Sequence, residues 1–332
     1  MPSLFNSSEN KRIIRKAWNA PLLEHLTEKF GRKLAYFGLP SPEAEDIFDW
    51  INYLDFIVAF QCRDYPNPSD PSQSDEAIRH LESNLNDLMR KKKITDYQLY
   101  DGYIEEVILN GKDNDNLKFN LNDFITIYNL DFCNEITFPQ NVLNERTGLL
   151  EPVYKLHVIK KIIDLQRENN SIPFKFVLLL TVKANFWRIE ASNYESQMKD
   201  DPNIGPYLEK ISTLRGLNKS VRILKTYVFH TLSQILSSNN YIPEFLPVVL
   251  YRGGGDNDLV QFTIVCTYEP TVGRIAISKQ CFRHFINQSF LTPIPRNKQM
   301  EPIVSKFINE DSPDPNPINL LKTSAVYEKF WK

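Results

Sequence analysis

The sequence has few of the residues that hold metals. Only four cysteines occur in 332 residues, and no two lie within four positions of each other, as zinc-knuckle ligands would. None of the five histidines stands four residues from another. No metal site is therefore expected. The cysteines are interpreted as buried or edge thiols in a reducing cytoplasm, because a free cysteine packs like a small hydrophobic residue. They are Cys62, Cys133, Cys266 and Cys281.

Long apolar runs are also missing. No stretch approaches the ~20 apolar residues that cross a bilayer. Residues 1–16 lack the apolar core of a secretion signal. The formal net charge of -2 argues against a protein whose whole surface binds nucleic acid, although local basic patches are compatible with it. These absences predict a soluble cytoplasmic protein that does not enter a membrane.

What the sequence does contain is an alternation of short apolar runs and amphipathic helices. Residues 34–37 predict a strand that ends at Gly38. Ser41 followed by Pro42 is a favourable helix start, because serine can cap a helix and proline suits its first position. The helix expected from residue 43 precedes a second apolar run at 56–60. Strand, helix and strand in about thirty residues indicate a βαβ unit.

The alternation continues along the chain. The segment FKFVLLLTV (174–182) is the most hydrophobic, and nine residues without polar alternation fit a central strand covered on both faces. Two apolar runs around a glycine-rich turn, 245–255 and 259–269, predict a hairpin. Further helices are expected over 11–31, 74–93, 153–170 and broadly 203–237, and further strands over 97–103, with a continuation through 107–109, and over 124–134.

Together these elements predict an α/β protein with a mostly parallel, Rossmann-like sheet that is flanked by helices and closes with an antiparallel hairpin. The expected organisation is a helical extension over 1–30, one α/β domain over 31–290, and a proline-rich strap over 291–332. The segment 63–74, RDYPNPSDPSQS, has little to bury and is expected to be an exposed loop over the carboxyl ends of the strands.

The order of strands and helices over about residues 30–270 resembles class I S-adenosylmethionine-dependent methyltransferases. In such a sheet a ligand lies outside the carboxyl ends of the strands. The resemblance implies S-adenosylmethionine as cofactor, with Gly38 and Glu43 after the first strand and Asp101 and Tyr103 after the third. Asp101 corresponds to the acid that meets the adenine amino group, and Tyr103 is placed to stack on a ring. A ligand-free turn at Gly38 and an acidic bend at Asp101 are the competing interpretations.

The fourth strand ends in Asn129-Leu130-Asp131, which loosely resembles the position where amino-methyltransferases hold a target nitrogen. Asn129 and Asp131 are therefore the candidate catalytic residues. A polar strand end bonded to its neighbouring loops explains the same residues. The turn after the first strand departs from the family pattern, since it has one glycine and then Pro40 and Pro42, which remove backbone donors.

Two functions follow from these observations. The first is a methyltransferase-like enzyme acting on a macromolecular or large substrate. The second is a methyltransferase-shaped interaction subunit of a multi-protein system that has lost the cofactor, with a protein or nucleic-acid partner. The nucleic-acid hypothesis depends on basic helix faces, for which a solvated surface is the alternative. The residues of those faces are Lys210, Arg215, Lys219, Arg222, Lys225 and the run Arg90 to Lys93.

Overall fold

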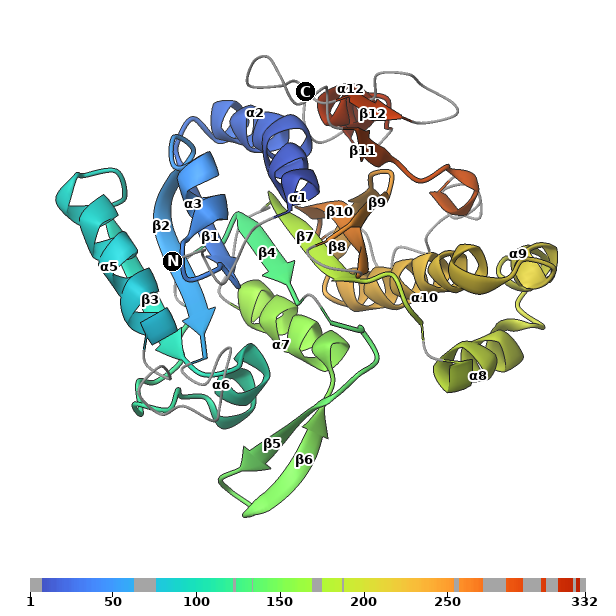
Figure 1. Ribbon diagram of the computed structural model, residues 1–332, viewed down its shortest axis with the longest axis horizontal. Coiled ribbons are helices and arrows are strands. Elements are labelled where there is room, and N and C mark those ends of the chain that lie inside the picture. The colour runs from blue at the N-terminus through green and yellow to red at the C-terminus, as the bar shows by residue number, and fades with distance from the viewer. Residues whose placement is uncertain are drawn as a thin grey trace. The chain divides into compact units, whose positions relative to one another are not determined.

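Figure 1 shows the helices and strands of the computed structural model. The chain divides into two compact units. The first unit contains residues 14–131 and 139–172, and the second contains 8–13, 132–138 and 173 onward. The structure describes residues 8–62, 76–121, 124–132, 134–168, 175–186, 188–253, 257–270, 285–294, 306–308, 316–324 and 327–328. The loop predicted at 63–74 lies outside these described residues.

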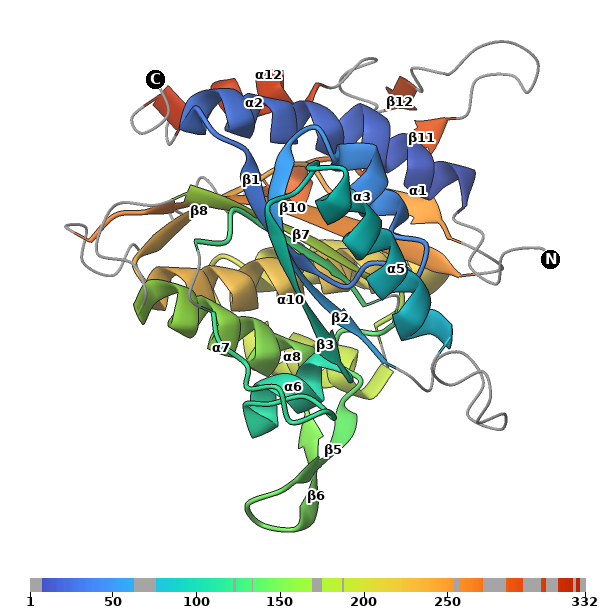
Figure 2. The same ribbon diagram turned by 90° about the vertical axis from the view of Figure 1, so that its left-hand side faces the viewer.

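The first unit is built on four parallel strands in the order β3-β2-β1-β4. Their bounds are β1 Leu34–Gly38, β2 Leu54–Gln61, β3 Asp96–Asp101 and β4 Ile127–Asp131. Helices α3 (Glu45–Trp50) and α5 (Glu76–Arg90) lie on one face of this sheet, and α6 (Ile104–Asn110) and α7 (Lys155–Glu168) lie on the other (Figure 2). Because neighbouring parallel strands need such crossover helices, the sequence alternation is the direct cause of this layering.

Apolar side chains of these strands form an aromatic core. Phe37 of β1 packs against Phe60 of β2 and Tyr128 of β4, with ring centroids 5.0 and 5.3 Å apart. Tyr100 of β3 stacks on Phe60 at 5.2 Å. Rings in offset or tilted pairs of this kind stabilise a core beyond the area they bury. This core holds the four strands in register and so fixes where their carboxyl ends lie.

The helix before β1 is interrupted. Residues Ile14–Asn19 form a π-helical segment, η1, between α1 (Glu9–Ile13) and α2 (Ala20–Phe30). Trp18 of η1 is fully buried. The helix predicted over 11–31 is therefore present, with a change of helix type inside it.

Helix α3 begins later than the sequence predicts. Its first residue is Glu45, and the preceding residue, Ala44, has a positive φ of 52°. The N–H of Ala44 donates to the carbonyl of Ser41 at 2.8 Å. The residues after Ser41 therefore form a tight turn, so the helix start predicted at Ser41 and Pro42 is wrong.

Between β4 and α7 the chain forms a two-stranded arm that the sequence analysis missed. It consists of β5 (Gln140–Asn144) and β6 (Leu149–Val153), paired antiparallel. Gly148 closes the turn with a φ of 69°, a conformation that glycine adopts without steric cost. Asn110 at the end of α6 braces the arm by donating to the carbonyl of Leu143 at 3.1 Å.

The second unit has antiparallel strands packed with long helices. β10 (Asp258–Tyr268) pairs with β7 (Lys175–Lys183), β8 (Tyr241–Phe245) and β9 (Val249–Arg252), in each case antiparallel. Seven consecutive residues of β7 are buried, as predicted for the most hydrophobic segment. The remaining described elements are α8 (Arg188–Met198), α9 (Gly205–Ser212), α10 (Gly216–Ser238), β11 (Thr292–Ile294), β12 (Lys306–Ile308) and α12 (Pro317–Lys322).

The predicted fold class is confirmed: the chain is an α/β protein with a mostly parallel sheet, flanking helices and the β9–β10 hairpin. The predicted continuation of the third strand through 107–109 is wrong, because these residues belong to α6. Among the described helices, none has the length and hydropathy needed to cross a bilayer.

Candidate functional site

Three polar side chains meet near the carboxyl end of β1 in the first unit. The hydroxyl of Tyr36 donates to Oδ2 of Asp46 at 2.6 Å, and Nδ2 of Asn129 donates to the same oxygen at 2.7 Å. Nδ2 of Asn129 also lies 3.3 Å from the Tyr36 hydroxyl. All three side chains are buried. The strand ends therefore contain a closed hydrogen-bond cluster, contributed by β1, α3 and β4, which we call the Asp46 cluster.

The Asp46 cluster sits directly against Gly38. A β-carbon at Gly38 would lie 2.5 Å from the carbonyl oxygen of Asn129 and 2.6 Å from the Tyr36 hydroxyl. Gly38 and Asn129 are register partners, and the N–H of Leu39 donates to the Asn129 carbonyl at 3.1 Å. Glycine is thus required here for the close approach of the protein's own atoms. The space above Gly38 is filled by Tyr36.

Burial dominates the electrostatics of the cluster. It raises the pKa of Asp46, while the hydrogen bond from Tyr36 and the charge of Arg15 act in the opposite direction. Burial and the neighbouring Asp46 carboxyl raise the pKa of the Tyr36 hydroxyl well above its usual value. The guanidinium of Arg15 itself pairs with Glu45 and Asp49 on α3, at 3.0 and 2.9 Å. A phenol with a raised pKa stays protonated, so Tyr36 acts as a hydrogen-bond donor to Asp46.

The loop between β1 and α3 offers few backbone donors. Pro40 and Pro42 have no N–H, and the N–H groups of Leu39 and Ala44 are already committed. Glu43 is half-buried in this loop. Its Oε2 makes no hydrogen bond with the residues that the structure describes.

The predicted residues after β3 have different surroundings. Asp101 is 1% exposed, its N–H donates to Oδ2 of Asp113 at 3.1 Å, and its carbonyl accepts from the N–H of Asn114 at 3.0 Å. Tyr103, at the N-terminal boundary of α6, is 40% exposed. The loop at 113–114 therefore fixes the backbone of Asp101, while the ring of Tyr103 faces solvent.

The structure brings some predicted residues together and separates others. Asn129 lies beside Gly38, and Asp131 is half-buried two residues further along β4. Asp101 ends β3, which is separated from β4 by β2 and β1. Three strand spacings of ~4.8 Å place these strands about 14 Å apart. The cofactor and catalytic roles of Gly38, Glu43, Asp101, Tyr103, Asn129 and Asp131 remain predictions.

Sequence reasoning missed Tyr36 and Asp46. The only signal for Tyr36 was its position two residues before Gly38, which puts both on the same face of a strand. Asp46 stands among the acidic residues of α3, where an exposed face is the ordinary expectation. Only the packing of α3 on the sheet identifies it as the acceptor for two donors.

S-adenosylmethionine is the cofactor that the methyltransferase resemblance implies, and the β1–α3 loop does not fit it. A glycine-rich turn binds such a ligand through open glycines and free N–H groups. Here the Tyr36 hydroxyl covers Gly38, and prolines occupy two of the next four positions.

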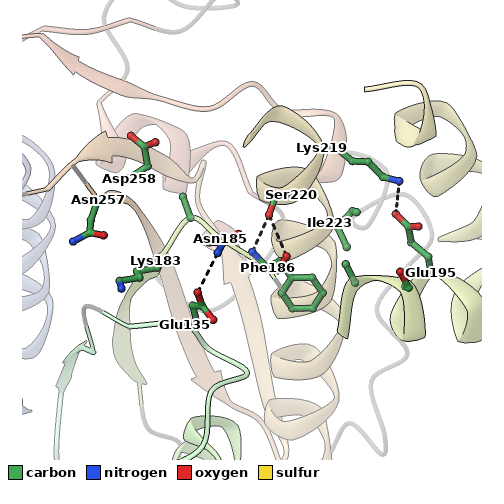
Figure 3. Close-up of a pocket in the computed structure, with 13 residues that line it drawn as sticks. Glu135, Lys183, Asn185, Phe186, Glu195, Lys219, Ser220, Ile223, Asn257 and Asp258 are labelled. Atoms are coloured by element: carbon green, nitrogen blue, oxygen red, sulfur yellow. Dashed lines mark hydrogen bonds and ion pairs between the residues drawn. The ribbon is translucent and has the colours of Figure 1, made fainter. Parts of the chain in front are cut away.

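The second unit contains an open pocket of about 730 Å³ (Figure 3). Asn185, just after β7, donates to Oε1 of Glu135 at 3.1 Å, and Lys219 of α10 pairs with Glu195 of α8 at 3.1 Å. The hydroxyl of Ser220 accepts from the N–H of Phe186 at 2.8 Å. Its lining is thus rich in charged and amide groups that are bonded to one another. Among the described residues, no group of three His, Cys, Asp or Glu side chains could hold a metal.

The basic helix face predicted on α9 and α10 is not a continuous solvated surface. Lys225 is fully buried, and its Nζ donates to the carbonyl of Gln288 at 2.7 Å. The Arg222 guanidinium lies 5.7 Å from the centroid of the Phe290 ring, and Lys219 pairs with Glu195. Packing inside the second unit therefore removes Lys225 from the predicted face, while Lys210 and Arg215 are exposed, and a nucleic-acid contact through this face remains a prediction.

No family model and no curated protein matches the chain. The solved structures that it resembles include several methyltransferases. An O-methyltransferase from Streptomyces achromogenes, solved with S-adenosylmethionine, is 10% identical over 76% of this chain and 80% of its own, with a TM-score of 0.35. A small RNA methyltransferase is 13% identical over 77% of this chain and 26% of its own, with a TM-score of 0.36. Likenesses this remote carry no argument about activity or substrate.

Proposed function

We propose that this protein is an interaction subunit built on a methyltransferase-type scaffold, and that it does not transfer methyl groups at its strand ends. The observation that supports this most is the Asp46 cluster packed against Gly38. A cofactor at this place would have to displace the Tyr36 ring and hydroxyl, which are fully buried and bonded to Asp46. Leaving the Asp46 carboxylate without that donor is costly, because hydrogen bonds to charged groups are worth about 1.5–3 kcal/mol.

A second observation supports the interaction role. The arm formed by β5 and β6 carries Leu143, Leu149 and Leu150 with exposed fractions of 49, 64 and 71%. Leu143 and Leu150 are directly paired across the arm, so these two side chains form an apolar pair on one face, while Leu149, paired with Asn144, lies on the other face. Apolar surface of this kind on an element held away from the core is typical of protein docking.

The alternative is the enzyme: an S-adenosylmethionine-dependent methyltransferase acting on a macromolecular or large substrate. The exposed ring of Tyr103 and the half-buried carboxyl of Asp131 favour it, because both can be reached from solvent. The Oε2 atom of Glu43 would accept a hydrogen bond from a ligand. In this alternative, Asp101 binds the nucleoside and Asp131 acts at the reacting centre.

Titration calorimetry of S-adenosylmethionine and S-adenosylhomocysteine into the full chain separates the two functions. The proposal expects neither heat nor a thermal shift at millimolar ligand. Binding that is weakened at least about tenfold by Asp101→Ala, which corresponds to about 1.4 kcal/mol, would favour the enzyme with its predicted cofactor site and overturn the proposal. Binding that is unaffected by Asp101→Ala would overturn it as well, since the scaffold would still hold the cofactor.

The interaction role is tested with the arm. Tagged wild-type chain and the Leu149→Ser/Leu150→Ser variant are compared by quantitative mass spectrometry of co-purified proteins. The proposal expects a partner that the wild type retains and the variant loses, while Leu117→Ser, at an exposed leucine outside the arm, retains it. Identical co-purified proteins for all three chains would contradict a docking role for the arm.

A further inference from the structure

Two exposed turns at the amino ends of the parallel strands bring six cations together in the first unit. Arg32 and Lys33 lie between α2 and β1, Arg90 ends α5, and the three lysines at 91–93 follow it before β3. All six residues are exposed. Nζ of Lys33 donates to the carbonyl of Lys93 at 3.0 Å, so the two turns adjoin each other. We call these six residues the amino-edge patch.

Little negative charge is paired with this patch. Among the described residues, the recorded ion pair within it joins Arg90 to Asp87 at 3.7 Å, and both side chains are more than half exposed. Such a pair is weak. Basic residues at helix C-termini are favoured by the helix dipole, but this effect is limited to the last turn. It explains Arg90 and Lys91 and leaves the two lysines beyond them unexplained.

The backbone of Lys92 gives a second, independent observation. The N–H of Lys93 donates to the carbonyl of Leu88, and the N–H of Lys92 donates to that of Met89. These two bonds form a Schellman motif that ends α5, with Lys92 in the left-handed conformation at φ 54°. The neighbouring turn after α2 fills the equivalent left-handed position with Gly31, at φ 62°. Lys92 thus occupies a position where glycine is conformationally preferred, and its charge lies beyond the reach of the helix dipole.

We propose that the amino-edge patch binds the phosphate backbone of a nucleic acid. Clustered exposed lysines and arginines neutralise phosphates and release counterions, and they do so without reading the sequence. An anionic membrane surface is less suited, because such sites combine basic residues with apolar side chains that insert. Of the exposed large apolar residues described, Met89 is the one that is next to the patch in the sequence. The patch lies at the opposite ends of the strands from the Asp46 cluster, so it operates with or without a cofactor.

The test uses fluorescence anisotropy of a labelled duplex of ~20 base pairs with the full chain, over about 50–200 mM salt. Wild type is expected to bind with a dissociation constant in the nonspecific range of ~10⁻⁴–10⁻⁶ M and a steep salt dependence. Lys92→Gly should weaken binding about eightfold at ~0.1 M salt and reduce the logarithmic salt slope by about 0.9, the value of one phosphate contact.

Lys92→Gly is informative because it removes the charge and relieves the backbone. Its unfolding midpoint should be unchanged or raised, so a loss of binding cannot come from misfolding. The control is Lys161→Gln, an exposed lysine of α7 with the same change in charge. The proposal is overturned if the wild type does not bind the duplex, or if Lys92→Gly weakens binding no more than Lys161→Gln. Binding to phosphatidylserine vesicles without binding to the duplex also overturns it.

Discussion

Replacing Tyr36 with phenylalanine tests whether the Asp46 cluster holds a buried carboxylate. The substitution keeps the ring and removes only the hydroxyl that donates to Asp46 at 2.6 Å. Asp46 is left with Asn129 as the remaining donor of the cluster. Because a hydrogen bond to a charged group is worth about 1.5–3 kcal/mol, we expect the free energy of unfolding at pH 7 to fall by about that amount.

The loss should also depend on pH. The Tyr36 hydrogen bond opposes the rise of the Asp46 pKa that burial causes, so removing the bond raises this pKa further. A group with a raised folded-state pKa contributes stability below its unfolded pKa and loses it as pH rises through the folded pKa. The difference between variant and wild type should therefore shrink as the pH falls and the carboxyl of Asp46 takes up a proton in the folded state.

Urea denaturation followed by tryptophan fluorescence measures this difference, because Trp50 lies 6.5 Å from Tyr36, between ring centroids. Tyr128→Phe is the matched control. Its buried hydroxyl donates to the neutral amide oxygen of Gln166, so its removal should cost about 0.5–1.5 kcal/mol at every pH. A Tyr36→Phe loss under about 0.5 kcal/mol, or one that does not change between pH 4 and pH 7, would refute an ionised Asp46 held by Tyr36.

Three further outcomes follow from the described contacts. Gly38→Ala should lower the free energy of unfolding by about 3 kcal/mol in urea titrations, because its β-carbon would meet a backbone carbonyl at 2.5 Å. Burial raises the pKa of Glu244 to about 7. Its contribution to stability is therefore full below pH 4.5 and is lost as the pH rises through about 7. In thermal melts, the Glu244→Gln variant should not show this loss of stability. Burial lowers the pKa of Lys225 to about 7. Its contribution to stability is therefore full above pH 10.5 and is lost as the pH falls through about 7. Lys225→Met should make the unfolding temperature less dependent on pH in this range.

The fold was predictable because hydrophobic periodicity encodes it. Residues 56–60 and 174–182 were identified as strands from uninterrupted apolar runs, and the described residues 56–60 and 175–182 lie in strands that are largely buried. Boundaries were less accurate where a short element follows a turn. Residues 107–109 are as apolar as a strand, and only the helical hydrogen bonds that follow Tyr103 distinguish α6.

The candidate site was predictable only as a location. The rule that ligands bind at the carboxyl ends of parallel strands directed attention to Gly38 and Asn129, and these two residues do lie side by side. The side chains packed against Gly38 could not be predicted in the same way. Asp46 and Asn129 are 83 positions apart and meet only after the sheet has formed. No local pattern reports such a contact, and the arm at 140–153 was missed because its strands alternate too weakly to be recognised.

The arm formed by β5 and β6 can change its sequence and length without affecting the fold of the parallel sheet. Its strands form a sheet of their own, joined to the rest of the first unit by α6 and by the chain that continues into α7. Lengthening a loop costs little, about 0.6 kcal/mol for each doubling. Insertions, deletions and changes of side chain in the arm can therefore accumulate without shifting the register of the four parallel strands. Homologous chains should differ most in length here, and a domain grafted at the turn before Gly148 should leave the parallel sheet intact.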